Sequence, residues 1–196
     1  ARQLLGGDAV VVSDQRTPEA FAQQARQADL QTNTNVSFPT MARATGAAPS
    51  PLGAASGVDP ATAPSNTADG MAPPATRLVA LKAVESGYPL RGRLELDGLT
   101  PQTGAGIPLV GEVWVDAALL EALGLQTGQM LGLGERSFRI SAVIEREPDR
   151  GAGFMTFAPR VMMNAADLAS TGLVQPASRV TWRMAVAGDA AAAERF

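Results

Sequence analysis

The chain has 196 residues, of which 45% are hydrophobic and 18% are charged, a composition typical of a folded globular protein rather than a disordered one. Its formal net charge is -3, and no run of Lys or Arg occurs, which argues against nucleic acid as a partner because phosphate binding needs clustered basic residues. The chain contains no cysteine and no histidine, which excludes disulfides, thiol nucleophiles, Ser-His-Asp triads and HExxH metal sites within it.

The ends of the chain look like interrupted helices. Residues 1–5 read as the end of one helix and residues 190–196 as the start of another. No stretch approaches the roughly 20 apolar residues that a membrane span needs, and no signal peptide is recognisable. We therefore expect a segment that lies between two membrane spans, although ordinary trimmed termini would look the same.

The first forty residues predict two strands around a helix. Three valines at 10–12 follow a Gly-Gly-Asp turn and indicate a short buried strand. Thr17-Pro18-Glu19 combines a capping hydroxyl, a first-turn proline and an early acid, so a helix should begin there and run to about Leu30. Residues 32–42 predict the second strand. The buried face of the helix should carry Phe21, Ala25 and Ala28.

Residues 44–75 differ in kind from the rest of the chain. The segment contains prolines at 49, 51, 60, 64, 73 and 74, no Lys or Arg, and few large apolar side chains. Such a segment does not bury enough apolar surface to offset the entropy lost on ordering. We expect a flexible insertion in a loop that joins two neighbouring strands.

The remainder predicts short strands and helices. Asp116 and Asn164 should cap two helices that end at Gly124 and Gly172, and Asp167 has the spacing of a capping-box acid. Period-2 alternation of apolar residues is clearest in the strand over 137–144. The other strands are expected over 78–84, 93–96, 112–115, 128–133, 154–157 and 179–186. This mixture predicts an α+β protein of two subdomains, one of them inserted in the other at about 111–175.

Five sequence blocks stand out together by their order and spacing. They are Phe38–Met41, Lys82–Val84 with Gly87–Gly92, Gly111–Asp116, Glu147–Arg150 and Ala158–Met163. Taken in this order, they resemble the periplasmic domain of YbbP-like permeases, a branch of the MacB-like ABC transporters associated with lysophospholipases. The resemblance covers nearly the whole chain except residues 44–75.

This resemblance implies a fold, a location and a role. A discontinuous porter-like subdomain would comprise residues 1–110 and 176–196, and a Sabre-like subdomain would comprise residues 111–175. The domain would face the periplasm from an inner-membrane permease and relay motion driven by a cytoplasmic ABC ATPase subunit. A periplasmic lysophospholipase or thioesterase and a lipid-like substrate are the further partners it implies. Neither a cofactor nor a catalytic role is expected, and the chain has no GxxxxGK[ST] phosphate-binding motif.

Three acids, Glu145, Glu147 and Asp149, alternate along one segment and raise two alternatives to a purely structural role. One is a divalent-cation site and the other is carboxylate catalysis on lipids or glycans. Cation loops usually combine more oxygen ligands with a glycine at the turn, so the pattern favours a solvated strand end with a salt bridge. A Ser–Lys dyad would need Lys82, the one lysine, which lies in a strand-like run.

The candidate contacts to a partner or a lipid are Tyr88, Arg91, Asp149, Arg150 and Arg160. An aromatic and an arginine on the turn over 87–92 suit an interface, but a rigid turn in which Tyr88 covers the core is the favoured interpretation. The two later arginines would bind lipid phosphates or partner acids, or else form an internal ion pair such as Arg160 with Glu147 or Asp149. Similarly, Met155, Met162 and Met163 indicate either a surface for acyl chains or, more usually at strand spacing, core.

The function predicted from the sequence is that of a non-catalytic extracytoplasmic domain of an ABC permease. It would relay ATPase-driven motion to act on lipid-like or hydrophobic molecules or on partner proteins at the membrane. The alternative is a free-standing periplasmic adaptor that binds a partner protein and has no role in transport.

Overall fold

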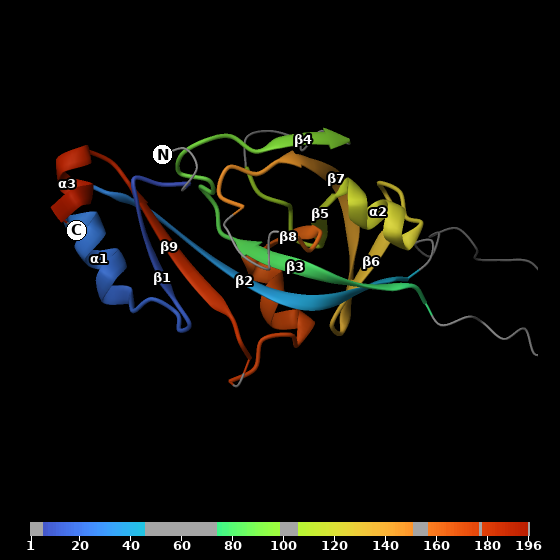
Figure 1. Cartoon of the computed structure of the whole chain (residues 1–196). Coiled ribbons are helices and arrows are strands. Elements are labelled where there is room, and N and C mark those ends of the chain that lie inside the picture. Colours follow the sequence, from blue (N-terminus) through green and yellow to red (C-terminus); the bar gives the residue numbers. More distant parts are fainter. Residues whose placement is uncertain (1–5, 46–73, 99–105, 151–156, 177, 196) are drawn as a thin grey trace, which may run out of the picture.

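The computed structural model describes residues 6–45, 74–98, 106–150, 157–176 and 178–195, and it shows one mixed sheet with short helices (Figure 1). Within these residues the sheet has nine strands in the order β1-β9-β2-β3-β8-β5-β7-β4, and β6 pairs with both β2 and β7. The predicted α+β class is confirmed. The strands are β1 (Ala9–Ser13), β2 (Gln31–Ala44), β3 (Thr76–Val84), β4 (Glu95–Gly98), β5 (Glu112–Asp116), β6 (Met130–Leu133), β7 (Arg136–Arg146), β8 (Arg160–Asn164) and β9 (Thr181–Ala187).

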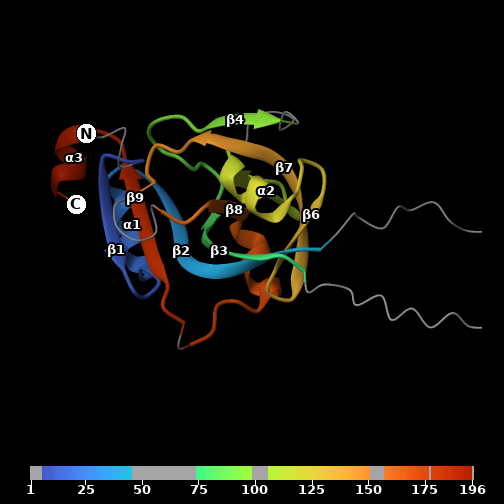
Figure 2. The ribbon, with the colours of Figure 1, turned by 45° about the vertical axis from the view of Figure 1, so that its right-hand side comes forward.

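The double pairing of β6 closes part of the sheet into a ring. Hydrogen bonds lead from β2 to β3, β8, β5, β7, β6 and back to β2. The first part of β2 pairs with β9, and its last three residues pair with β6, so the long strand serves both the ring and its extension. β9 and β1 extend the sheet beyond β2, and β4 lies on the outside of β7 (Figure 2). Closure removes the exposed edges that the six strands would otherwise have.

The main core fills the inside of this ring. Because side chains alternate along a strand, one set from each strand points inward. Helix α2 (Ala117–Leu123) adds Leu119 and Leu123, and the 3₁₀ helix η3 (Ala165–Thr171) packs Leu168 against the same cluster. The buried strand residues include Val36, Phe38, Val79, Leu81, Ala83, Val113, Val115, Leu131, Leu133, Phe138, Ile140, Val161 and Met163.

A second, smaller core lies on the outer face of the ring. It contains Val84, Trp114, Ala142, Ile144 and Met162 from four strands, with Tyr88 and Ile107 packed over them. Between the inward-facing Leu81 and Ala83, strand alternation turns Lys82 to this outer face. The chain after β3 therefore covers a charged side chain as well as an apolar cluster.

The helices α1 (Glu19–Gln27) and α3 (Ala190–Arg195) lie together at the β1–β9 end of the sheet (Figure 1). Ala25 and Leu30 pack there against Met184, Val186 and Ala193. None of the helices in the described part of the chain has the length and apolarity of a membrane-crossing segment.

Several sequence predictions need correction. Of the expected buried face of α1, only Ala25 is buried, in a cluster with Met184 and Val186, whereas Phe21 is 41% exposed. Pro18, not Thr17, is the N-cap residue of α1. The strand expected over 93–96 is β4, two residues later. Asp167 is not a capping-box acid, because its carboxylate accepts a hydrogen bond from the backbone N–H of Gly111.

Apart from β8, which lies outside every expected strand, the other described strands lie where they are expected, to within about two residues, and so do the caps Asn164, Gly124 and Gly172. Asn164 accepts a hydrogen bond from Ala166 N, and Gly124 and Gly172 end their helices in the left-handed conformation. Residues 46–73 of the expected insertion and residues 154–156 of the strand expected over 154–157 lie outside the described residues. The division into a porter-like and a Sabre-like subdomain stays a prediction.

Candidate functional site

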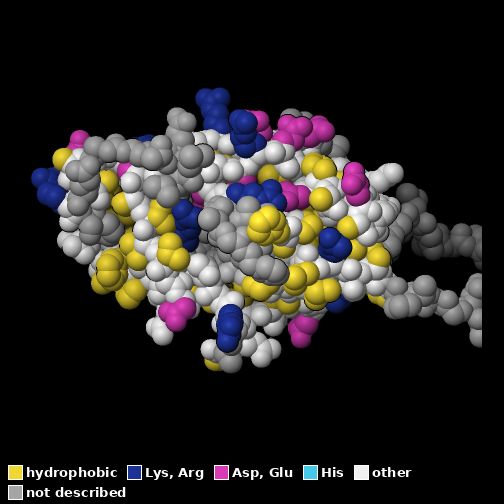
Figure 3. All heavy atoms as spheres, viewed as in Figure 1, with side chains coloured by type: hydrophobic (Ala, Val, Ile, Leu, Met, Phe, Trp, Pro, Cys, Tyr) yellow, Lys and Arg dark blue, Asp and Glu magenta, His cyan; other side chains and the backbone are white. Residues whose placement is uncertain are grey.

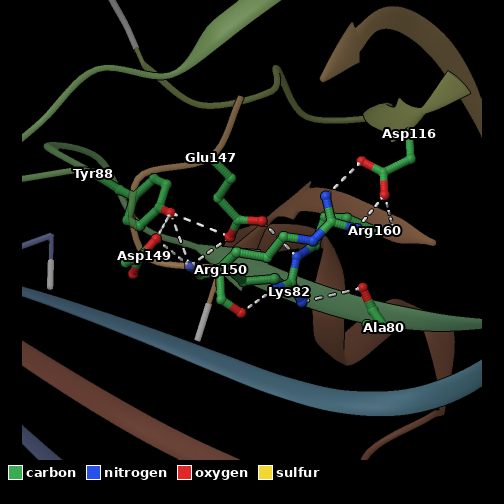
Figure 4. A network of polar contacts seen from close by, with 8 residues as sticks. All are labelled: Ala80, Lys82, Tyr88, Asp116, Glu147, Asp149, Arg150 and Arg160. Atoms are coloured by element: carbon green, nitrogen blue, oxygen red, sulfur yellow. Dashed lines mark hydrogen bonds and ion pairs between the residues drawn. The ribbon is translucent and has the colours of Figure 1, made fainter. Parts of the chain in front are cut away.

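Lys82 lies at the centre of a buried ionic network on the outer face of the ring (Figure 4). Its side chain is 2% exposed, and its ammonium donates hydrogen bonds to Glu147 Oε1 at 2.9 Å, Asp149 Oδ1 at 2.8 Å and the Tyr88 hydroxyl at 2.8 Å. The Tyr88 hydroxyl in turn donates to Asp149. All three donors of the ammonium are therefore satisfied by buried partners.

Arg160 extends the network along β8. Its Nε donates to Glu147 Oε2 at 2.7 Å, so the two oxygens of Glu147 bind one cation each. The remaining guanidinium nitrogens donate to the carbonyl oxygens of Ala80 at 3.4 Å and Arg150 at 3.1 Å. The expected internal ion pair of Arg160 with Glu147 is confirmed.

Asp116 joins the junction of β5 and α2 to the same network. The sequence pattern predicts a helix cap, and Asp116 is the N-cap residue of α2, but its side chain makes no capping hydrogen bond. Its carboxylate instead accepts two hydrogen bonds from the guanidinium of Arg150, at 3.3 and 2.5 Å, and one from the backbone N–H of Arg160 at 2.9 Å. The network thus links β3, the turn after it, β5, the segment after β7, and β8.

Burial and charge shift the pKa values of two members of the network. Burial, reinforced by the charges of Asp149 and Glu147, raises the pKa of the Tyr88 hydroxyl well above its ordinary value. Burial alone would also raise the pKa of Glu147, but the charges and hydrogen bonds of Lys82 and Arg160 outweigh it and lower that pKa. Glu147 is therefore held ionised and Tyr88 is held neutral.

The titration of Tyr88 tests this electrostatic arrangement directly, because the chain contains a single tyrosine. We expect phenolate absorbance to appear in the folded protein only well above pH 10, and near pH 10 once the protein is unfolded in urea. Because the raised pKa belongs to the folded state, its contribution to stability is complete below pH ~10 and is lost as the pH rises further. A phenolate signal near pH 10 in the folded protein would contradict the buried placement.

The carboxylates Glu145, Glu147 and Asp149 do not form a common site. Glu145 is exposed, whereas Glu147 and Asp149 are buried and bound to Lys82. The expected salt bridge is confirmed, but the expectation of a solvated strand end is wrong for the two paired acids, because the segment after β7 folds back over β3. Among the described residues, no group of three or more potential ligands is placed to hold a metal ion.

The five candidate contact residues fall into two places. Four of them meet in the network, namely Tyr88, Asp149, Arg150 and Arg160. Tyr88 also covers the smaller core, as the favoured interpretation of the turn over 87–92 predicts. Arg91 lies apart from them, where it binds the carboxylate of Asp8 at 2.8 Å and the carbonyl oxygen of Gly188 at 3.4 Å. Their role as contacts to a partner or a lipid stays a prediction. Met162 and Met163 are core residues, and Met155 lies outside the described residues.

A cleft of about 290 Å³ opens beside the network on the outer face of the sheet. Its walls come from β1, β2, β3, β8 and β9 and from the segment after β7. Among its described lining residues, Lys82, Arg150, Arg160, Arg179 and Arg183 are cationic and Asp149 is acidic. Lys82, Arg179 and Arg183 are far apart in the sequence, so sequence patterns do not reveal them as parts of one site, and the sheet pairing brings them together.

Comparison with known proteins finds a relative by sequence. No protein-family model matches the chain. The chain is 31% identical over 191 residues to the uncharacterized ABC transporter permease YbbP of Escherichia coli (strain K12), and the match covers 96% of the chain. It spans only 19% of the length of that permease.

Two solved structures match most of the chain. The periplasmic region of MacB from Actinobacillus actinomycetemcomitans matches 98% of this chain and 82% of its own, with a TM-score of 0.50 and 11% identity. The extracellular domain of the noncanonic ABC-type transporter YknZ from Gram-positive bacteria matches 90% of this chain and 82% of its own, with a TM-score of 0.49 and 10% identity. The resemblance predicted from the five sequence blocks is thus confirmed by the YbbP match and by the MacB-like fold.

Proposed function

Because the chain is homologous to part of an ABC transporter permease and has the fold of the MacB periplasmic region, we propose that it is the extracytoplasmic domain of such a permease. In this proposal the permease lies in the inner membrane and the domain faces the periplasm. The observation that carries the proposal is the match to YbbP, which extends over 191 residues and so includes nearly the whole domain.

The proposed role is to relay motion driven by a cytoplasmic ATPase subunit, without catalysis in this chain. A domain that transmits a displacement must deform less than it moves. The closed ring of strands and the buried network favour such stiffness, because Lys82 on β3 binds acids that lie 65 and 67 residues away in the sequence, and one of these acids also binds Arg160 on β8. The proposed division into a porter-like and a Sabre-like subdomain places Lys82 in the first and its two acids in the second.

The relayed motion would act on lipid-like or hydrophobic molecules or on partner proteins at the membrane, with a periplasmic lysophospholipase or thioesterase among the proposed partners. Catalysis by this chain is not part of the proposal. The chain has no histidine or cysteine, and two of its three alternating acids are bound to its one lysine.

The test uses the complete permease, with its ATPase, in lipid nanodiscs. Since this chain has no cysteine, a fluorophore on Val110→Cys, at a position that is 67% exposed, reports on the domain once cysteines elsewhere in the permease are removed. We expect co-purification with the ATPase and a change in quenching by nitroxide lipids between the nucleotide-free and vanadate-trapped states. An ATPase variant unable to hydrolyse ATP should not enter the trapped state and serves as the control.

Co-purification without any nucleotide-dependent change would contradict the relay. The alternative function, a free-standing periplasmic adaptor, predicts a soluble product that does not co-purify with an ATPase. The two functions are thus separated by the first step of the experiment, before any fluorescence is measured.

A further inference from the structure

A second pocket, of about 320 Å³, opens between η3 and the strands β2, β3 and β9, and its floor is the main core of the ring. Val36 and Ala83 line it and are 2% and 0% exposed members of that core. Leu168, Val174 and Trp182 also line it, and they are only partly buried against the same core. Apolar side chains left open to solvent at the mouth of a ring of strands form the kind of surface at which apolar ligands bind.

The strand register sets the width of this pocket. Trp182 pairs with Val36, and Val36 pairs with Ala83, so one row of side chains crosses β9, β2 and β3. Two strand spacings separate the ends of this row, which gives a width of about 10 Å. With η3 as the facing wall, the pocket has room for a single hydrocarbon chain.

Two charges of opposite sign stand on opposite sides of the row. The guanidinium of Arg16 lies 5.7 Å from the centre of the Trp182 ring, on the β9 side, and Glu85 follows the end of β3. Arg16 is exposed and Glu85 is half-buried, and neither forms an ion pair with a described residue. A cationic ligand would be repelled by Arg16 and an anionic ligand by Glu85, whereas a zwitterion matches both charges.

The surface seen in Figure 3 does not carry a single sign of charge. Lys and Arg side chains are interspersed there with Asp and Glu side chains. The formal net charge of the whole chain is only -3. Selection of a ligand by charge at the pocket therefore depends on the local pair, Arg16 and Glu85.

We propose that this pocket binds a zwitterionic single-chain amphiphile, whose hydrocarbon chain lies between η3 and the row of Trp182, Val36 and Ala83. Its phosphate would face Arg16 and its ammonium group would face Glu85. An uncharged hydrophobe would cover the apolar floor and leave both charges without partners, and a zwitterion without a chain would leave the floor uncovered. This inference names a ligand class within the proposed function and rests on it.

The test titrates the 196-residue chain with dodecylphosphocholine, below its micelle concentration, and follows acrylamide quenching of tryptophan fluorescence. Trp182 lines the pocket and is partly exposed, whereas the other tryptophan, Trp114, is 1% exposed, so the quenching reports mainly on Trp182. We expect saturable protection from acrylamide in the wild type. That protection should disappear in Trp182→Phe.

A pair of variants on η3 tests the position of the ligand. Ala169 is exposed and lines the pocket, so Ala169→Phe fills it and should weaken binding about tenfold or more through lost apolar burial of the ligand. Ala166 is exposed on the same short helix and lies outside the pocket lining. Ala166→Phe is therefore the matched control and should change the affinity by less than about twofold. Similar urea unfolding of the two variants would show that a difference in binding comes from the pocket.

Further ligands identify what the pocket recognises. Dodecyl phosphate and dodecyltrimethylammonium, which carry one sign of charge each, should bind about threefold or more weakly than dodecylphosphocholine. Phosphocholine, which has no chain, should give no protection at the same concentration. Glu85→Gln should remove the preference for dodecylphosphocholine over dodecyl phosphate, because it removes the acid that repels the anion.

Three outcomes would each overturn the proposal: no saturable protection by dodecylphosphocholine, protection that persists in Trp182→Phe, or unchanged affinity in Ala169→Phe. The pocket would then be left to another occupant, such as an apolar side chain of a partner protein. Equal affinity for the singly charged amphiphiles would overturn the zwitterionic class. Failure of this inference is distinguishable from failure of the proposed function, because co-purification with the ATPase and the nucleotide-dependent change do not require this ligand.

Discussion

Replacing Lys82 with methionine is expected to lower the free energy of unfolding by about 3–5 kcal/mol, as the loss of one partner from a buried ion pair does. Methionine fills a similar volume, so the loss is electrostatic rather than a packing defect. It leaves Asp149 with the Tyr88 hydroxyl as its hydrogen-bonding partner within the described network, and it leaves Glu147 with Arg160 and a longer contact, of 3.5 Å, to the same hydroxyl. Urea unfolding at neutral pH, followed by tryptophan fluorescence, measures the change.

Two further variants test whether the loss of stability in Lys82→Met comes from unpaired charge. Arg146→Met breaks an exposed ion pair with Glu95 and should cost less than about 1 kcal/mol. The double variant Lys82→Met/Asp149→Asn should be less destabilised than the sum of its single variants, because the second change removes an acid that the first leaves unpaired. Strict additivity would show that the two side chains do not interact in the folded protein.

Much of the fold was predictable because local signals and tertiary structure agree in it. Strand alternation identified β7, and the left-handed glycines Gly124 and Gly172 identified two helix ends. The closed ring was not predictable, because it depends on β6 pairing with both β2 and β7. Nothing in the four residues Met130–Leu133 specifies two partners, and that pairing is set by how the whole sheet curves.

Four residues of the candidate site were predicted from the sequence, but its central residue, Lys82, was not. Tyr88, Asp149, Arg150 and Arg160 attract attention as polar or aromatic residues at turns and strand ends. Lys82 instead lies inside the apolar run of β3, and it was considered for a Ser–Lys dyad and as part of a strand but not as the partner of buried acids. One signal was available: a lone lysine on the same strand face as Ala80 and Val84 needs a buried counter-charge. Its acids lie 65 and 67 residues away, so sequence spacing alone did not identify them.

Glu147→Gln should lower the free energy of unfolding at neutral pH by about 3 kcal/mol, because Glu147 is the one acid that binds both Lys82 and Arg160 in the described network. Glu145→Gln, two residues earlier and exposed, is the matched control and should have an effect within about 0.5 kcal/mol. The pair separates a structural carboxylate from a solvated one in the same segment. It also bears on the carboxylate-catalysis alternative, which predicts a loss of activity without such a loss of stability.

The pH dependence of the free energy of unfolding is an independent test of the Glu147→Gln prediction. Because the pKa of Glu147 is lowered in the folded protein, its ionised form contributes stability that is complete above the unfolded pKa of ~4.3 and is lost as the pH falls through the folded pKa. The difference in stability between the wild type and Glu147→Gln should therefore be largest near neutral pH and shrink in acid, whereas the difference for Glu145→Gln should stay near zero throughout. A Glu147→Gln difference that is independent of pH would mean that ionisation of Glu147 does not stabilise the folded chain. The network would then be held together by packing, and its proposed stiffness would need another source.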